Sequence, residues 1–220
     1  MIDVDRRPDA PPSLASQKSF CDDDVIEALN IDFHGKCYLC ERRHNVAYME
    51  VDHRVPKAKV LALKFEWTNL FPACSPCNGQ RTRGTPTDGY LSPGQGVEQR
   101  LTQTATPSND VNVELSCDFS AVSATDAPAI ATATELQRLH TVDTRARARK
   151  RMKGAELLRE IASHYTKEIA TLEVSVLRAR RDKQSAGEAE GLLRARLSRK
   201  ARFSMLLRSL VAPSLADLFD

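Results

Sequence analysis

The stretch MEVDHRVPKAK, at 49–59, places a carboxylate and an imidazole side by side as Asp52 and His53. Val51 favours a strand here, and Pro56 ends it because proline has no N–H to donate. An imidazole with a pKa of about 6.5 can take up a proton near neutral pH, and a carboxylate is a hard oxygen ligand of the kind that Mg²⁺ and Mn²⁺ bind. The pair could therefore supply a general base and a metal ligand for hydrolysis.

Two C-x-x-C pairs flank this stretch, Cys37 with Cys40 before it and Cys74 with Cys77 after it. Two residues between the cysteines let one tight turn present both thiolates to a tetrahedral Zn²⁺ ion. Four thiolates fill the coordination of that ion, so we expect a structural zinc site. A pair of redox dithiols is the alternative, but no thioredoxin-like strand and helix pattern accompanies the cysteines.

Other candidate ligands lie close to or outside these four cysteines. His34 and His44 flank the first pair and could replace a cysteine, although four cysteines suffice without them. Cys21 and Cys117 lie outside the segment that the two C-x-x-C pairs enclose, and we interpret both as ordinary small buried residues.

Polar residues of the second half of this block complete a possible phosphodiester-cleaving site. Hydrolysis of a phosphodiester needs a base for water, a cation for the developing charge and help for the leaving oxygen. Asn78 follows Cys77 directly, so the zinc site would fix its position, and it could bind the ion together with Asp52. Arg81 lies one helical turn further on and could hold the phosphate bidentately.

The strand itself raises a difficulty, because successive side chains point to opposite faces. Asp52 and His53 would then not face one ion in a flat strand. We expect a bend near Pro56 to relax this constraint and to place ligand and base around one phosphate.

The pattern CYLC…VDHRVPK…TNLFPACSPCNGQR, over residues 36–81, resembles the HNH endonuclease family. The resemblance implies a ββα-metal core of two strands and a helix around one catalytic Mg²⁺ or Mn²⁺ ion. It implies that Asn69 orients the base His53 and braces the loop, where the alternative is a plain turn residue. Arg81 fills the family's Lys or Arg position. Lys57 and Lys59 are either phosphate contacts or solvated lysines.

A looser resemblance extends beyond this core. An R-x-P arm, a YLSP turn after the core and a basic helical tail are similar to the HNH subunit of Septu-type anti-phage systems. That family implies an ABC-like ATPase partner, for which leucine stripes in the tail could form a docking surface. Leu91-Ser92-Pro93 stands where the family tends to have LLDP, so a carboxylate is missing.

Composition bounds the remaining possibilities. The chain has 220 residues, of which 41% are hydrophobic, so a real core can form. No apolar run approaches the about 18 residues that would span a membrane, and the N-terminus has no apolar segment typical of a signal peptide. We therefore expect a cytoplasmic protein that makes no membrane contact, in which thiols stay reduced.

The net charge of +3 conceals an asymmetry. Residues 138–208 contain 19 Lys/Arg and 8 Asp/Glu, a net of +11, whereas the rest of the chain has a net of −8. A basic tail favours a polyanion partner, and a solvated helix face is the equally open alternative.

The expected fold class is α+β, with four segments along the chain. Residues 1–30 form an extended arm and a short helix at 22–30, residues 31–86 the zinc-pinned nuclease core, residues 87–130 a loop and a β-hairpin insertion, and residues 131–220 a basic, mainly α-helical region. The hairpin would pair 97–105 with 111–119, and the next helix would be capped by Thr125 or Asp126. We expect the tail's leucine stripes to pack two long helices, with a break at 183–191.

These observations favour a metal-dependent endonuclease that acts on nucleic acid, with DNA favoured and RNA possible. The alternative is a zinc ribbon that binds nucleic acid or a partner without cutting it; such a module needs only the four cysteines, and not Asp52, His53 and Asn78. A third possibility, an adaptor with a decayed nuclease site, is disfavoured because base, ligands and Arg81 are all present.

Overall fold

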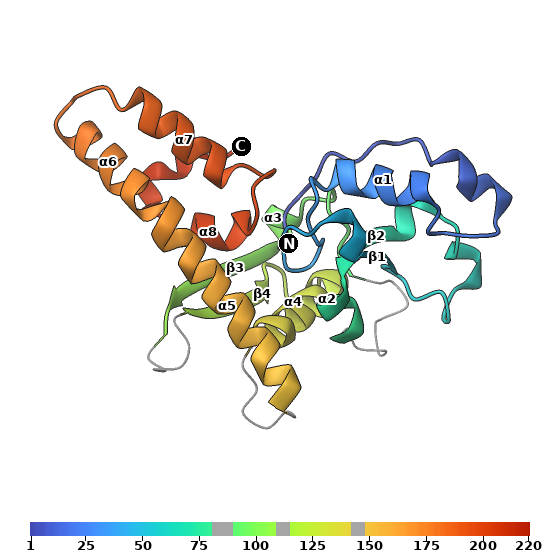
Figure 1. Cartoon of the computed structure of the whole chain (residues 1–220). Helices are drawn as coiled ribbons and strands as arrows, with labels where there is room; N and C mark the ends of the chain where they lie inside the picture. The colour runs from blue at the N-terminus through green and yellow to red at the C-terminus, as the bar shows by residue number, and fades with distance from the viewer. Residues whose placement is uncertain (81–89, 109–114, 142–147) are drawn as a thin grey trace. The chain divides into compact units, whose positions relative to one another are not determined.

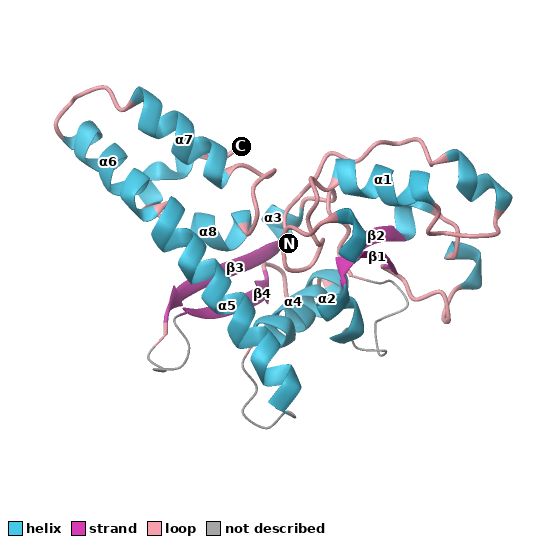
Figure 2. Cartoon of the chain, in the orientation of Figure 1, coloured by secondary structure: helices cyan, strands magenta, loops and turns pink. Residues whose placement is uncertain are grey.

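The protein has an α+β architecture, as the sequence predicts. The computed structural model describes residues 1–80, 90–108, 115–141 and 148–220, in which two small sheets are accompanied by helices (Figures 1 and 2). The chain forms two compact units: unit 1 comprises 1–102 and 119–139, and unit 2 comprises 103–118 and 140–220. The division into four consecutive segments stays a prediction, because each unit joins segments that are distant in sequence.

Unit 1 is built around the first sheet. Strand β1 pairs antiparallel with β2, in a register that sets Met49 opposite Cys74 and His53 opposite Leu70. The helices and strands that begin in this unit are α1 (Asp23–Asp32), β1 (Met49–His53), β2 (Leu70–Cys74), α2 (Ser75–Gln80), α3 (Val97–Arg100), β3 (Leu101–Pro107) and α4 (Ala127–His140). Short 3-10 helices span Pro12–Ser16, Val46–Tyr48, Leu61–Leu63 and Trp67–Asn69. The helix expected at 22–30 is thus confirmed as α1.

Strand β2 is the buried centre of unit 1. All five of its residues are buried, which is what an apolar Leu-Phe-Pro-Ala-Cys run requires. Pro72 has no N–H to donate, but its carbonyl accepts a hydrogen bond from the backbone N–H of Tyr38 at 2.9 Å. The segment carrying the first cysteine pair is therefore joined to the strand that leads to the second pair.

The extended N-terminal arm expected at 1–19 is instead packed into unit 1. Met1, Ile2 and Val4 are buried. The guanidinium of Arg6 lies 3.8 Å from the centre of the Trp67 ring, and its Nη2 donates to the Trp67 carbonyl at 2.5 Å. Burial lowers the pKa of Arg6 to about 10, so it stays a cation over the aromatic face at neutral pH.

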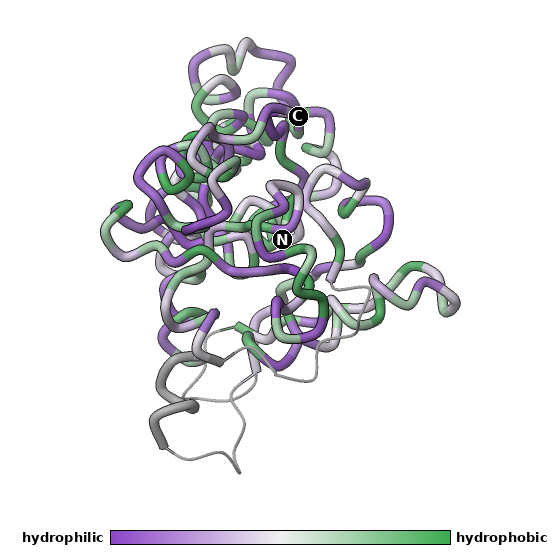
Figure 3. The backbone as a smooth tube through the Cα atoms, turned by 90° about the vertical axis from the view of Figure 1, so that its right-hand side faces the viewer, coloured by the Kyte–Doolittle hydropathy of each residue, from purple (hydrophilic) through white to green (hydrophobic). Residues whose placement is uncertain are grey.

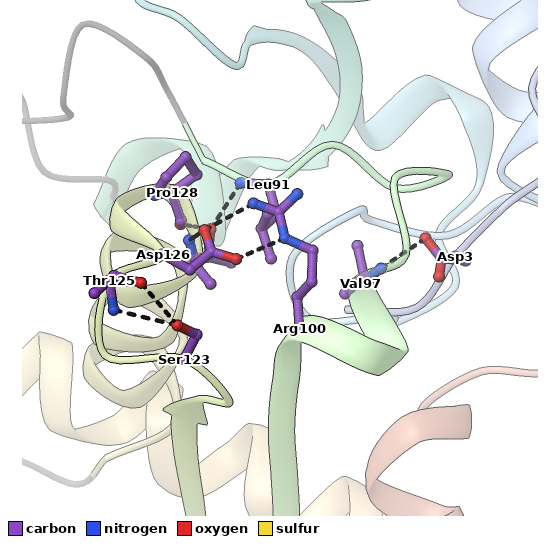
Figure 4. Close-up of polar contacts among 10 residues, drawn as sticks. Asp3, Leu91, Val97, Arg100, Ser123, Thr125, Asp126 and Pro128 are labelled. Atoms are coloured by element: carbon purple, nitrogen blue, oxygen red, sulfur yellow. Dashed lines mark hydrogen bonds and ion pairs between the residues drawn. The ribbon is translucent and has the colours of Figure 1, made fainter.

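The segment after the nuclease core departs from the predicted hairpin in its first four residues. Val97–Arg100 form one helical turn, and strand β3 begins only at Leu101. The carboxylate of Asp3 explains the turn, because it accepts a hydrogen bond from the backbone N–H of Val97 at 3.1 Å (Figure 4). It also accepts one from the backbone N–H of Gly94 at 2.7 Å. An acidic group at the start of a helical turn satisfies amides that have no partner within it.

The remainder of the hairpin and the following helix match the prediction. Strand β3 forms a two-stranded sheet with β4 (Leu115–Ala121). Of the turn expected at 106–110, the first two residues belong to β3, which ends at Pro107, and residues 109 and 110 lie outside the described part of the chain. Asp126 caps α4 by accepting from the N–H of Ala129 at 3.2 Å, and its carboxylate also binds the guanidinium of Arg100 through two contacts of 2.7 Å (Figure 4).

Unit 2 is a helical assembly whose leucine stripes form its core. Its helices are α5 (Ala148–Glu168), α6 (Ala170–Arg181), α7 (Gly187–Leu197) and α8 (Ser204–Leu210), followed by a 3-10 helix at Pro213–Leu218. Hydrophobic and hydrophilic residues alternate along these helices (Figure 3). The buried members of the predicted stripes are Leu157, Ile161, Ile169, Leu193, Leu197 and Leu206. The predicted packing role of the stripes is thus confirmed for these residues.

The predicted break between two long helices is correct only in its first half. Residues 182–186 connect α6 to α7, but α7 already begins at Gly187, and Ile169 separates α5 from α6. Leu192 belongs to the predicted stripe yet is 47% exposed. Within the described part of the chain, no helix combines the length and the hydropathy needed to cross a membrane.

Much of the positive charge of unit 2 is engaged within the unit. Arg180 lies 2.8 Å from both Glu190 and Asp217, and Arg196 lies 3.1 Å from Glu168. Such solvent-exposed ion pairs contribute little to stability. They nevertheless leave fewer of these arginines available to a polyanion than the charge count indicates.

His164, on α5, combines burial with a nearby positive charge. Its Nδ1 accepts a hydrogen bond from Nη2 of Arg202 at 3.0 Å, while the carboxylate of Glu168 lies 3.3 Å away. Burial and then the charge of Arg202 lower the pKa of His164 below 6.5, against the opposite effect of Glu168. The imidazole is therefore neutral at pH 7.

We expect an NMR titration to give His164 a pKa below 6.5 and Arg202→Gln to raise that pKa. At His164 the folded state binds fewer protons than the unfolded chain does. The free energy of unfolding therefore keeps the full contribution of His164 above pH 6.5 and loses it as the pH falls toward the lowered pKa of the folded state. A pKa at or above 6.5 in the wild type would mean that the Glu168 contact outweighs burial.

Candidate functional site

The four predicted zinc ligands meet in unit 1. The sulfur atoms of Cys37, Cys40, Cys74 and Cys77 all lie within 4.8 Å of one another, and all four residues are buried. No histidine belongs to this cluster in the parts of the chain that the structure describes, so His34 and His44 are not needed as ligands. The four cysteines of the predicted site are thus clustered closely enough to hold one metal ion.

The donor set fits Zn²⁺. Zinc–sulfur bonds of about 2.3 Å at tetrahedral angles separate the sulfurs by about 3.8 Å, and the sulfurs of Cys40 and Cys74 are 3.9 Å apart. Burial opposes ionisation of Cys37, but hydrogen bonds with the three other sulfurs hold its pKa well below the usual value. Four cysteines in this arrangement would hold the ion without an open position for substrate.

Three elements bring the cysteines together. Cys37 and Cys40 lie on a tight turn in which the N–H of Glu41 donates to the Cys37 carbonyl at 2.9 Å, with Glu41 at a φ of 57°. Cys74 ends β2, and Cys77 lies on the short helix α2 that follows at once. A bound zinc would thus tie the first turn to the β2–α2 junction.

Asp52, a predicted metal ligand, is held by the first cysteine turn. The hydroxyl of Tyr38 donates to its Oδ2 at 2.6 Å, and Asp52 is only 7% exposed. An ionised carboxylate only accepts hydrogen bonds, so the hydroxyl stabilises the charged form of Asp52.

His53, the predicted base, is held by different groups. Its Nε2 lies 2.9 Å from the carbonyl oxygen of Lys64, and the ring of Phe20 packs edge-on against the imidazole with centroids 4.6 Å apart. A carbonyl only accepts hydrogen bonds, so Nε2 carries a proton and Nδ1 carries the lone pair of the neutral ring. This tautomer is the one that a base acting through Nδ1 requires.

The expected bend lies after His53, so it does not change the relative orientation of Asp52 and His53. Strand β1 stays paired with β2 through His53, and the chain bends only from Arg54 onward. Consistent with strand alternation, Asp52 contacts the cysteine turn, whereas His53 contacts Phe20 and the Lys64 carbonyl.

Asn78 lies against a residue that sequence reasoning did not identify. Its Nδ2 donates to Oε2 of Glu50 at 2.6 Å, from α2 to β1. Because a carboxylate only accepts, this contact identifies the amide nitrogen, so the Oδ1 end of Asn78 is the end available to a cation. Glu50 and Asp52 are two residues apart on β1 and therefore share a face of the strand.

Asn69 braces the loop after the strand. Its Nδ2 donates to the carbonyls of Val55 at 3.0 Å and Leu63 at 3.1 Å, and its Oδ1 accepts from the Val55 N–H at 2.8 Å. The loop so held leads to Lys64, whose carbonyl orients His53. These contacts agree with the bracing role that the family resemblance implies.

The predicted phosphate contacts are placed only in part. Arg81 lies outside the described residues. Lys57 is exposed, and its Nζ lies 4.4 Å from the centre of the Phe20 ring, which packs against His53. The surface beside the base therefore includes a cation.

Sequence reasoning missed Glu50, Tyr38 and Phe20. Glu50 had a readable signal, because it alternates with Asp52 on a predicted strand. Tyr38 stands between two cysteines, where nothing in the spacing indicates a role. Phe20 lies 33 residues before His53 in the sequence, and only the fold brings the two rings together.

Residues 37–84 match the family model of HNH endonuclease, so the chain carries an HNH endonuclease domain there. A relative named Septu protein PtuB, from Bacillus thuringiensis, is 30% identical in an alignment that covers 34% of this chain and 35% of the relative. The chain thus spans about a third of the length of this relative. No solved structure matches the chain significantly.

We expect wild-type protein to bind one zinc ion per chain and Cys40→Ser to lose most of it, because three thiolates hold zinc less firmly than four. The variant should also lose the cooperative unfolding of unit 1. Elemental analysis and the fluorescence of Trp67, the chain's one tryptophan, would measure the two effects. Cys21→Ser, at an exposed cysteine outside the cluster, is the matched control and should keep the zinc. Full zinc in Cys40→Ser would contradict the assignment.

Asn69→Asp should destabilise unit 1 by about 3 kcal/mol, because it replaces an N–H donor by a carboxylate oxygen facing two carbonyls. Denaturant unfolding followed by Trp67 fluorescence would measure the loss. Asn45→Asp is the control: Asn45 is exposed, and its Oδ1 accepts from the Ala47 N–H, which an aspartate can also do. If Asn69→Asp and Asn45→Asp were equally stable, Asn69 would not brace the loop.

Proposed function

We propose that this protein is a metal-dependent endonuclease that hydrolyses phosphodiester bonds of nucleic acid. The HNH domain match supports nuclease activity. The observation that carries the proposal is the contact between Glu50 and Asn78 at 2.6 Å, on the strand that also carries Asp52 and His53 and on the helix that carries a cysteine of the cluster. A zinc ribbon that only binds its partner has no need of these four residues.

In the proposed reaction His53 is the general base. The Lys64 carbonyl holds the Nε2 proton, so Nδ1 takes up the proton from the attacking water. The ring of Phe20 restricts rotation of the imidazole by packing against it. The base is thus oriented before substrate binds.

Asp52, Asn78 and Glu50 would hold the catalytic ion. All three offer hard oxygen atoms, which suit Mg²⁺ or Mn²⁺, and the structure brings Glu50 and Asn78 into contact. When bound, the ion would supply positive charge to the phosphate and to the leaving oxygen. Arg81 would contact the same phosphate, and Lys57 a neighbouring one.

DNA is the proposed substrate, since HNH enzymes mostly cut DNA, and RNA is the alternative. The similarity to Septu protein PtuB, together with the YLSP turn and the basic tail, supports a role as nuclease effector of an anti-phage defence complex with an ABC-like ATPase partner. Under this proposal the partner raises the nuclease activity above that of the purified protein alone.

We expect purified protein with Mn²⁺ or Mg²⁺ to nick supercoiled plasmid and His53→Ala to reduce the rate at least about 100-fold, the usual contribution of a general base. Gel electrophoresis of the plasmid measures the rate. His164→Gln, a histidine of unit 2, is the matched control and should cut normally. Omission of the divalent ion tests the metal requirement better than EDTA, which would also remove zinc.

Each outcome of this assay bears on one part of the proposal. If His53→Ala still cuts the plasmid at the wild-type rate, His53 is not the general base. Protein that is inert on plasmid and on single-stranded RNA, alone and with the proposed ATPase partner, would favour the zinc-ribbon binding module instead.

A further inference from the structure

Tyr38 connects the cysteine cluster to the proposed catalytic ion. It stands between Cys37 and Cys40, and its hydroxyl donates to Oδ2 of Asp52 at 2.6 Å. Tyr38 is 3% exposed and Asp52 is 7% exposed, so water competes little for this hydrogen bond.

The position of the hydroxyl is determined by both ends of Tyr38. The backbone N–H donates to the Pro72 carbonyl at 2.9 Å, and the ring packs against Phe71 with centroids 5.2 Å apart. Phe71 is the residue of β2 that pairs with Asp52 across the sheet. The tyrosine is thus anchored on the strand pair that presents the carboxylate, while its neighbours in the sequence are cluster cysteines.

A carboxylate on a strand can rotate about its terminal bond, and such rotation decides which oxygen faces a cation. A hydrogen bond from a rigid donor removes this freedom. Partners of metal ligands act in this way, and their loss usually weakens metal binding about 10- to 100-fold.

We propose that Tyr38 is a positioning residue that holds Asp52 in the orientation in which it binds the catalytic divalent ion. The proposal rests on the proposed function, in which Asp52 is a ligand. It makes the first C-x-x-C turn part of the catalytic apparatus: the same four-residue turn supplies two zinc ligands and the donor that orients a ligand of the second metal.

The test is Mn²⁺ binding to zinc-loaded protein, measured by isothermal titration calorimetry on Tyr38→Phe, which removes only the hydroxyl. We expect the dissociation constant for Mn²⁺ to rise about 10-fold or more, with zinc content unchanged and the protein still folded at the assay temperature. In plasmid nicking, the half-saturating Mn²⁺ concentration should rise by the same factor, while the rate at saturating Mn²⁺ is kept. Tyr48→Phe is the matched control, because Tyr48 is 71% exposed and its hydroxyl should not affect Mn²⁺.

Asp52→Asn separates failure of the inference from failure of the proposed function. Unchanged Mn²⁺ binding in Asp52→Asn would mean that Asp52 is no ligand, which overturns the proposed site and the inference with it. Lost binding in Asp52→Asn with wild-type binding in Tyr38→Phe would overturn the inference alone. Loss of zinc or of the folded unit in Tyr38→Phe would also overturn it, because the hydroxyl would then serve the cysteine turn itself.

Discussion

The proposed nuclease site depends on the approach of four buried sulfurs to within 4.8 Å of one another. The core around them is thin: β1 and β2 have five residues each and α2 has six, so these elements would have little stability as isolated pieces. A metal cluster supplies in a few bonds the cohesion that a larger domain draws from apolar burial. Asn78 follows Cys77 in the chain, and Asp52 contacts Tyr38 beside Cys37, so two proposed ligands are attached to the cluster from opposite ends.

The second constraint is the alternation of side chains along β1. Because the strand is paired through His53, its two faces have different neighbours. Glu50 and Asp52 contact elements that carry the cysteines, whereas His53 contacts Phe20 and the Lys64 carbonyl. The proposed acidic ligands and the proposed base are thereby kept in different surroundings.

The sequence predicted the parts of this site that local spacing determines. The cysteine pairs, the strand with Asp52 and His53, and the cap at Asp126 all follow from short patterns. Long-range contacts were not predictable in this way. The arm at 1–19 packs because Arg6 finds an aromatic face more than 60 residues away, and the turn at Val97 forms because Asp3 accepts its amides. Residues 97–100 have a strand pattern in the sequence but form a helical turn, because the carboxylate of Asp3 accepts hydrogen bonds from its first amides.

The Lys64 carbonyl has a consequence for the order of proton movements. It can receive a hydrogen bond but no proton, so the imidazole has a single working nitrogen throughout the proposed cycle. A proton taken from water by Nδ1 leaves again by Nδ1, either to the departing oxygen or to solvent, and the base is restored only on the side that faces the substrate. Where the proton leaves to solvent, turnover is coupled to product departure, since a retained product would stand in the path by which His53 recovers its neutral form.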